Sequence, residues 1–454
     1  MTRADYPERL RARTARSAEL FRRAASRLPG GVSANLKHAE PYPLYMERGE
    51  GAYLFDVDGN RYVDYLLVFG TLLLGHGHPA ILGAIRRQLE RAGTVVFGPP
   101  HEQEVALAER LAELYPSMEM TRFTNSGLEA TLLAIRIAPA ATGRPMVAKF
   151  EGHYHGAHPD VLVSVHPPLA EAGPADTPQS VPDSADVGEP VLRRTLVLPW
   201  NDRDAVRAGL EAHGDRIAAL ILEPTLAGYI GPEPGFLAFL REETRRRGIV
   251  LIYDEVKTGF RLALGGAQEA YGVAPDLTVL GKVLGGGFPI GAVGGRRDLM
   301  ELTTPRPGRP DYEHVYHSGT FNGHPLAMAA GLATLEVLLQ PGVYRDLFAV
   351  TRRLREGIEA ALRDAGVPAL TQGEGSIFNV LIADRPARSY RDVLATDLDL
   401  RRALDLALLM RGVYNQPLNR FSLSIAHTPE VIDRTVEAFA AAAREAVTMI
   451  DRGR

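Results

Sequence analysis

The middle of the chain alternates between two patterns of hydrophobic and polar positions. Short apolar runs bounded by turn residues are typical of buried strands, and apolar residues at helical spacing between these runs predict helices. The predicted strands are 119–124, 145–149, 195–198, 217–222, 249–253, 276–280 and 290–295, and the predicted helices are 79–92, 101–114, 202–212 and 235–247. This alternation predicts an α/β fold in which helices cover both faces of a mostly parallel sheet.

Two further segments of this region stand out by their composition. Asn125-Ser126-Gly127 follows a predicted strand and opens another helix, which we expect to end at Pro139 because proline has no N–H to donate. Residues 166–190 are rich in Pro, Ala, Asp, Gly and Ser. That composition predicts a long surface loop, which could act as an active-site lid.

The pattern changes towards both ends of the chain. Residues 6–28 predict a surface helix, and 51–64 predict a hairpin that turns at Asp58-Gly59-Asn60. From Pro325 onward helices predominate, and short strands are expected near 376–382 and 421–425; the predicted helices are 325–338, 343–365, 398–411 and 429–448. The predicted organisation is an N-terminal segment that joins the small domain, a large domain and a small α+β domain, with limits 1–75, 76–324 and 325–454.

Composition narrows the class of protein. A chain of 454 residues exceeds what one hydrophobic core usually supports, and a net charge of −4 argues against nucleic acid or an anionic membrane as partner. The chain has no cysteine, which excludes disulfides and thiolate chemistry. No apolar run approaches the ~20 residues of a transmembrane helix, and the basic N-terminus lacks the apolar core of a signal peptide. We therefore expect a cytoplasmic enzyme that acts on small molecules.

Asp254 and Lys282 are the strongest candidates for chemistry. Each lies at or just past the carboxyl end of a predicted parallel strand, and this is the edge at which open α/β sheets bind ligands. Pyridoxal phosphate requires such a pair, because its aldehyde forms a Schiff base with a lysine and an acid keeps its pyridine nitrogen protonated. Lysine is also rare in this chain, where the only four are Lys37, Lys149, Lys257 and Lys282. A lysine among apolar residues and glycines is hard to explain as a surface charge.

Other motifs allow more than one interpretation. Ser126 and Gly127 could bind a phosphate at a helix N-terminus, although a serine there is more often only an N-cap. Tyr154 could lie over a flat ring or belong to the core. The histidines at 76–78 and 153–158 have no acidic ligand at a metal-binding spacing, so we predict no metal site. Gly281-Lys282 lacks the glycine and the hydroxyl residue that a phosphate-binding P-loop places around Gly-Lys.

Five short motifs follow one another along the chain. They are Phe123-Thr-Asn-Ser-Gly127, Phe150-Glu-Gly-His-Tyr-His-Gly156, Asp254-Glu-Val-Lys-Thr-Gly-Phe-Arg261, Leu280-Gly-Lys-Val-Leu-Gly-Gly-Gly287 and Gly319-Thr320. These motifs resemble those of class III aminotransferases, and more closely those of the glutamate-1-semialdehyde aminomutase branch. The resemblance runs from about Pro29 to the last helix. It implies the fold of type I pyridoxal phosphate enzymes and a homodimer with active sites at the interface.

The resemblance also implies roles for residues around the cofactor ring. Lys282 would form the Schiff base with the cofactor and act as general base and acid, and Asp254 would pair with the pyridine nitrogen. Val256 would pack on one face of the ring, and Tyr154 would lie near the other. Glu223 matches a further acid of the family's pocket.

For the phosphate, the resemblance implies binding by Ser126 and Gly127, joined by the partner subunit's Thr320. This chain departs from the family pattern at Leu128, where a small hydroxyl residue is usual. One phosphate hydrogen bond could therefore be missing or be supplied elsewhere.

Further departures lie on the side that faces the substrate. Lys37 stands where an aminomutase has an arginine for the substrate carboxylate, and Asn419 stands where a glutamate is expected. Lys37 and Arg420 are the candidates for binding a substrate carboxylate. From these departures we predict an aminotransferase that passes an amino group from an amino-carboxylate to a separate carbonyl acceptor. The alternatives are an intramolecular aminomutase of the glutamate-1-semialdehyde type and a catalytically silent binding protein, and the presence of both Asp254 and Lys282 argues against the latter.

Overall fold

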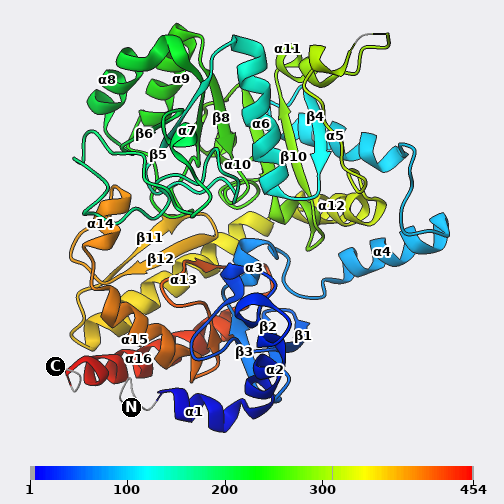
Figure 1. The fold of residues 1–454 in the computed structure, drawn as a ribbon. Coiled ribbons are helices and arrows are strands. Elements are labelled where there is room, and N and C mark those ends of the chain that lie inside the picture. The colour runs from blue at the N-terminus through cyan, green and yellow to red at the C-terminus, as the bar shows by residue number, and fades with distance from the viewer. Residues whose placement is uncertain (1–5, 309, 452–454) are drawn as a thin grey trace.

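A seven-stranded sheet forms the upper half of the molecule in Figure 1. The structure is a computed structural model that describes residues 6–308 and 310–451. In spatial order the strands are β4 (Met120–Thr124), β10 (Gly291–Gly295), β9 (Leu277–Gly281), β8 (Val250–Asp254), β7 (Ile217–Leu222), β5 (Met146–Phe150) and β6 (Thr195–Leu198). Within this sheet β10 runs antiparallel to both of its neighbours, and the other neighbouring pairs are parallel. The predicted α/β fold with a mostly parallel sheet is confirmed.

Both faces of this sheet are buried under helices. The covering helices are α6 (Gly127–Thr142), α8 (Arg203–His213) and α9 (Phe236–Arg247). Ile221 and Ile252 pack with the residues of α6 on one face, and Leu220 and Leu251 pack with those of α8 and α9 on the other. Side chains of a strand alternate between faces, so burial on both faces explains why these strands read as continuous apolar runs.

The carboxyl ends of β8 and β9 bring the two candidate residues to the same edge of the sheet. The strands are parallel neighbours, and Asp254, the last residue of β8, is in register with Val279 of β9. Lys282 comes directly after Gly281, the last residue of β9. Its φ of +47° is in the left-handed region, so the chain turns sharply as it leaves the strand.

The lower half of the molecule is assembled from both ends of the chain. β11 (Leu370–Glu374), β12 (Ile377–Leu381) and β14 (Phe421–Ser422) form one sheet, and β1 (Met46–Glu50), β2 (Tyr53–Asp56), β3 (Arg61–Asp64) and β13 (Val413–Tyr414) form another. β13 pairs in parallel with β3, so the last third of the chain is hydrogen-bonded directly to the N-terminal hairpin. The predicted domain limits remain a prediction, and residues 1–5 and 452–454 within them lie outside the described part of the chain.

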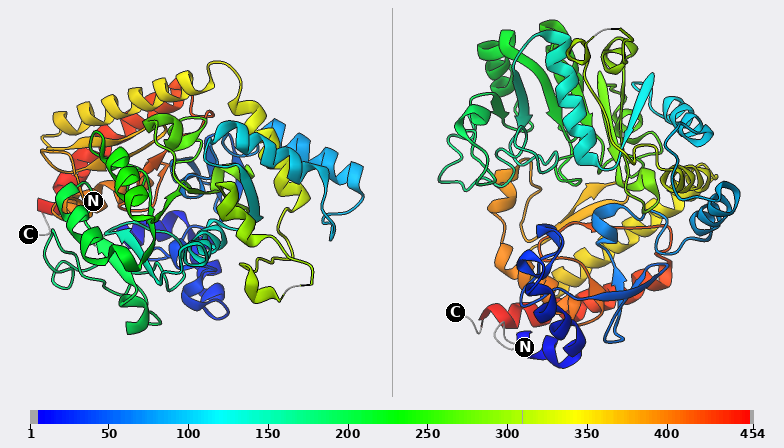
Figure 2. Two further views of the ribbon diagram at one scale, coloured as in Figure 1. Left: turned by 90° about the horizontal axis from the view of Figure 1, so that it is seen from above. Right: turned by 45° about the vertical axis from the view of Figure 1, so that its right-hand side comes forward.

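Long helices complete the lower half and its junction with the large sheet. They are α12 (Pro325–Leu338), α13 (Val343–Asp364), α15 (Leu398–Leu409) and α16 (Pro429–Asp451). Figure 2 shows α13 and α16 running side by side, and an ion pair between Arg353 and Asp433 joins them. The other helices are α1 (Tyr6–Arg13), α2 (Ala15–Ala25), α3 (Leu67–Gly70), α4 (Pro79–Ala92), α5 (Glu102–Leu114), α7 (Glu189–Leu192), α10 (Gly266–Tyr271), α11 (Arg297–Met300) and α14 (Tyr390–Leu394).

Two helices differ from the sequence-based expectation. The helix expected over 6–28 is broken at Thr14, whose φ of −136° is not helical and whose buried hydroxyl bonds to Tyr42 at 2.9 Å. The helix expected to end at Pro139 continues to Thr142 and ends at Gly143, which is left-handed. Burial of Ile137 and Ala138 holds this last turn in place despite the missing N–H of the proline.

No single helix in the described residues is long and apolar enough to cross a bilayer. α12 and α13 meet such a criterion of length and composition only when they are taken together, and they are bent by 79° relative to each other.

Candidate active site

Asp254 is a buried carboxylate with a donor on each oxygen. The residue is 4% exposed at the end of β8. Nδ1 of His155 lies 2.8 Å from Oδ2, and the backbone N–H of Val256 donates to Oδ1 at 3.1 Å. These contacts fix the orientation of the carboxylate at the edge of the sheet.

Lys282 is partly buried, and its ammonium form is disfavoured there. Desolvation is the main reason that its pKa falls to about 7, and the positive charges of Lys257 and Arg420 lower the pKa further. Asp254 and Glu223 act in the opposite direction without reversing the shift. A large share of the amine is therefore neutral near neutral pH, which is the form that accepts a proton or attacks a carbonyl.

Glu223 is a second buried acid, and it is paired with Lys257. Nζ of Lys257 lies 2.6 Å from one carboxylate oxygen, and the backbone N–H of Tyr154 donates to the other at 3.0 Å. Burial by itself would raise the pKa of Glu223, but Lys257, His153 and His155 together lower it to about 2. Glu223 is therefore ionised throughout the physiological range.

The N-terminus of α6 lies beside Val256. Ser126 caps this helix, because its hydroxyl accepts the N–H of Glu129 at 3.2 Å. A Cβ at position 127 would lie 2.8 Å from Cγ2 of Val256, so only glycine allows this close approach. The result is a helix N-terminus, which favours anions, held against the loop that follows β8.

The loop that contains Thr320 also reaches this helix terminus. Nδ2 of Asn125 donates to Oδ1 of Asn322 at 2.9 Å, which places residues 319–323 near the start of α6. Thr320 itself is exposed. Its predicted contribution to the partner's site stays a prediction.

Arg420 is a partly buried cation beside the same pocket. Its pKa is lowered by desolvation, and Glu223 opposes the shift. Nη2 donates to the carbonyl of Phe69 at 3.2 Å, and the buried Nε has no hydrogen-bond partner among the described residues. Phe69 belongs to a turn in which Leu67, Val68 and Phe69 all have positive φ, a strained arrangement for residues that are not glycine.

Lys37 lies in a different environment. It is exposed in the 28–38 segment, and its Nζ donates to the hydroxyl of Ser33 at 2.9 Å. The two predicted carboxylate binders therefore differ: Arg420 has an unused donor in a buried position, and Lys37 is a surface residue in this chain.

The comparison with known proteins identifies the family. The sequence model for "Aminotransferase class-III" matches residues 35–442. The chain belongs to the class III aminotransferases. A relative from Desulforudis audaxviator named glutamate-1-semialdehyde 2,1-aminomutase is 45% identical over 430 residues, 93% of this chain and 96% of the relative.

Solved structures of family members give the same fold. An omega-transaminase from Sphaerobacter thermophilus superposes with a TM-score of 0.90 at 40% identity, over 95% of this chain and 98% of that one. A glutamate-1-semialdehyde-aminomutase from Pseudomonas aeruginosa PAO1 in complex with PMP superposes with a TM-score of 0.87 at 28% identity, over 98% of this chain and 97% of that one.

The predicted cofactor, pyridoxal phosphate, is confirmed by the family and by its cofactor-bound structures. The residues of this chain fit it. An amine of lowered pKa at Lys282 suits an aldehyde, and the buried carboxylate of Asp254 suits a protonated ring nitrogen. The helix terminus at Gly127 suits a phosphate.

The prediction of an intermolecular aminotransferase is corrected by the curated relatives. Six of them, at 42–45% identity, are named glutamate-1-semialdehyde 2,1-aminomutase, which favours the alternative. The prediction gave too much weight to Lys37 and Asn419. Lys37 is exposed, and Oδ1 of Asn419 is occupied by the backbone N–H of Arg420, so neither substitution says which reaction the pocket supports.

Sequence reasoning missed two members of the site. His155 was weighed only as a metal ligand, yet it is the side-chain partner of Asp254. Lys257 was counted among the lysines without a role, yet it is the partner of Glu223. Its position three residues after Asp254, at the edge where ligands bind, was the signal available in the sequence.

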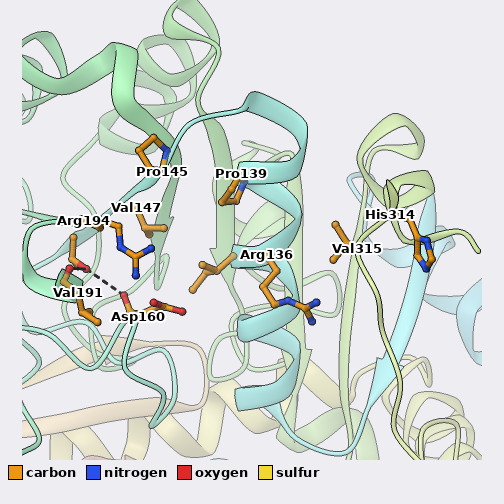
Figure 3. Close-up of a pocket in the computed structure, with 11 residues that line it drawn as sticks. Arg136, Pro139, Pro145, Val147, Asp160, Val191, Arg194, His314 and Val315 are labelled. Atoms are coloured by element: carbon orange, nitrogen blue, oxygen red, sulfur yellow. Dashed lines mark hydrogen bonds between the residues drawn. The ribbon is translucent and has the colours of Figure 1, made fainter. Parts of the chain in front are cut away.

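A separate cavity of about 360 Å³ lies beside α6, away from these residues. Figure 3 shows Arg136 on α6 and Asp160 and Arg194 on the adjoining segments around it. The cavity contains no residue of the predicted site, so we do not assign it to the chemistry at the sheet edge.

Proposed function

We propose that this protein isomerises glutamate-1-semialdehyde to 5-aminolevulinate, moving an amino group from carbon 2 to carbon 1 of one substrate. The observation that carries the proposal is the match along nearly the whole chain with curated aminomutases. The proposal is supported by three groups of the site: a base, an acid for the cofactor and, in Arg420, a cation whose Nε has no hydrogen-bond partner among the described residues.

Lys282 is the proposed proton carrier. Pyridoxal phosphate, when bound, supplies a carbonyl that condenses with amines and a ring that withdraws electrons from the substrate carbon. The amine of Lys282 would take a proton from the carbon on one side of the transferred nitrogen and return a proton to the carbon on its other side, so it ends each exchange unchanged. Asp254, held by His155 and Val256, would pair with the ring nitrogen and favour its protonated form.

The cofactor's remaining contacts are assigned to residues around the helix terminus. The backbone N–H groups at Gly127 and the hydroxyl of Ser126 would hold the phosphate, with the partner subunit's Thr320 completing the site in a homodimer. Val256 and Tyr154 would enclose the ring. Because Ser126 already caps α6, backbone groups would carry most of the phosphate binding.

Arg420 is the proposed anchor for the single substrate carboxylate. It is partly buried, and its Nε donor is free of other residues in the described chain. A desolvated guanidinium with an unused N–H donor can bind a substrate carboxylate through a charge-assisted hydrogen bond. Lys37 is the weaker candidate because it is exposed.

The predicted lid loop is tied down in this structure, which suits a reaction whose doubly aminated intermediate must not escape. Arg391 forms a two-pronged ion pair with Glu151 at 2.8 and 2.9 Å. The same guanidinium donates to the carbonyl of Gly173 at 2.8 Å. The loop is thereby fastened to both α14 and the residue that follows β5.

The proposal is tested by supplying glutamate-1-semialdehyde alone to the cofactor-loaded enzyme. We expect 5-aminolevulinate to accumulate over many turnovers, with no increase in rate when 2-oxoglutarate or pyruvate is added. A Lys282→Ala variant loaded with the same cofactor is the matched blank. Product that stops at about one equivalent per active site until a carbonyl acceptor is added would contradict the proposal.

A further inference from the structure

Lys257 is a second lysine in the active site, and the proposed reaction does not use it. It lies on the loop after β8, with a side chain that is 13% exposed. Nζ is 2.6 Å from Oε1 of Glu223 and 5.7 Å from the centroid of the Tyr154 ring. In a chain whose cations are nearly all arginines, a lysine held in this position calls for an explanation beyond solubility.

An ion pair with Glu223 explains how Lys257 is held in place. It does not explain why a positive charge lies near Lys282. Lys257 and Lys282 follow two parallel neighbouring strands, each three residues beyond the register pair Asp254 and Val279. The charged groups that act on Lys282 are Lys257, Arg420, Asp254 and Glu223. Both acids are already engaged: Asp254 by His155 and Val256, and Glu223 by Lys257 and the N–H of Tyr154. No hydrogen bond joins Lys282 to either acid in the described residues.

We propose that Lys257 is a positioning residue for the base: fixed by Glu223 and the Tyr154 ring, its positive charge adds to the effect of burial in favouring the neutral form of the Lys282 amine. The inference deepens the proposed function, because it rests on Lys282 as the proton carrier. Two like charges in one partly desolvated pocket repel, so a fixed positive charge near an amine disfavours the protonated form of that amine. Lys257 is fixed by its carboxylate partner Glu223, and no such partner holds Lys282 among the described residues.

The effect of a neutral amine is large near neutral pH. Burial, followed by the charges of Lys257 and Arg420, lowers the pKa of Lys282 to about 7. An ordinary lysine with a pKa of about 10.4 is less than about 1% neutral at pH 8. The lowered pKa makes most of the population neutral at that pH, roughly a hundredfold gain in the form that accepts a proton.

The test reads the protonation of Lys282 directly. The full-length enzyme is labelled with ¹³C at lysine Cε and loaded with the aminated form of the cofactor, which leaves Lys282 free. With four lysines in the chain, few resonances are expected, and Lys282→Ala identifies the one of interest. We expect Lys257→Met to move the titration of Lys282 upward by about one pH unit, a roughly twofold loss of neutral amine at pH 8 and a roughly tenfold loss near pH 6.

Two further variants separate charge from packing. Lys257→Arg keeps the charge and the partner for Glu223, so Lys282 should titrate as in the parent. The double variant Lys257→Met/Glu223→Gln leaves no unpaired carboxylate, and its titration should lie between those of the parent and Lys257→Met. Thermal melting and the visible absorption of the cofactor-loaded forms check that each variant folds and binds the cofactor.

Two outcomes would overturn the inference. The first is a Lys282 titration in Lys257→Met that equals the parent's, and the second is a Lys257→Arg variant that behaves like Lys257→Met. The titration requires no substrate turnover. Failure of the enzyme to isomerise glutamate-1-semialdehyde would therefore contradict the proposed function, and the titration would still decide this inference.

Discussion

The imidazole of His155 and the carboxylate of Asp254 form a buried pair, with 2.8 Å between Nδ1 and Oδ2. The His155 side chain is fully buried, and its Nε2 has no hydrogen-bond partner among the described residues. The imidazole thus holds the acid from a position that solvent does not reach. His155 thus orients Asp254 as an outer residue orients a metal ligand, by a hydrogen bond to the functional group.

We expect His155→Leu to weaken cofactor binding and slow turnover by about 10- to 100-fold, because a hydrogen bond to a charged group is worth about 1.5–3 kcal/mol. His155→Asn keeps a donor near the position of Nδ1 and should recover part of the loss. The dissociation constant for pyridoxal phosphate, measured by absorbance titration, checks this. Equal binding by the Leu variant and the parent would show that Asp254 does not depend on its partner.

Lys282 should be the only lysine that holds the cofactor covalently. Borohydride reduction followed by peptide mass analysis should place the label on Lys282, since Lys149 is fully buried with its Nζ donating to Val163, and Lys257 is paired with Glu223. Lys282→Ala should lose the label and at least about 100-fold in rate. A label on Lys257 in the parent enzyme would contradict this assignment.

Arg420 should affect substrate binding more than the chemical step. Arg420→Gln removes the proposed carboxylate anchor, and we expect KM to rise about 10- to 100-fold with a smaller change in kcat. The matched control is Arg297→Gln, at a surface arginine of α11 that is 60% exposed. If kcat falls alone while KM holds, Arg420 acts on the chemistry and the carboxylate lies elsewhere.

Glu255 should make the stability of the fold depend on pH. Its carboxyl is 1% exposed, and burial raises its pKa from 4.5 to about 7 despite hydrogen bonds from Ala267 and Thr258. The folded state therefore binds more protons than the unfolded state between these values, and the free energy of unfolding falls as pH rises through them. The contribution of this group is about 3 kcal/mol, lost by pH 8.

Glu255→Gln should remove that dependence, because an amide stays neutral and its oxygen can still accept both hydrogen bonds. The variant should melt at a higher temperature than the parent at pH 8 and at a similar temperature near pH 4.5. Glu301→Gln, at a side chain that is 55% exposed, is the control and should show no such difference. A variant less stable than the parent at pH 8 would mean that the carboxylate is ionised and stabilising in the fold.

The sequence predicted those strands and helices whose burial requires a recognisable pattern of apolar residues. Strands such as Ile217–Leu222 are buried on both faces and are apolar throughout, so their limits were predicted within a residue or two. Met46–Glu50 and Leu370–Glu374 were missed, because they are largely polar and partly exposed. Their pairing with neighbouring strands, rather than their own side chains, makes them strands.

The same distinction applies to the site. Asp254 and Lys282 could be found because each ends a recognisable strand, and the edge of a parallel sheet brings such residues together. His155 could not be paired with Asp254 from sequence, since they are 99 positions apart, and the loop that holds His155 follows β5, which is not a neighbour of β8. The direction of the Lys37 side chain depends on the short 3₁₀ helix Asn35–Lys37, a single turn that the spacing of apolar residues does not predict.

The left-handed turn at Leu67–Phe69 joins an early part of the chain to residues that are synthesised much later. Its carbonyl at Phe69 receives Arg420, which follows 351 positions later, and the next carbonyl, of Gly70, receives Arg261 at 2.7 Å. On the ribosome, the lysine and acid that serve the cofactor emerge well before the guanidinium proposed to hold the substrate. A chain that ended before position 420 would lack the guanidinium proposed to hold the substrate carboxylate, together with Phe421 and the residues of α16 that pack in the largest hydrophobic core.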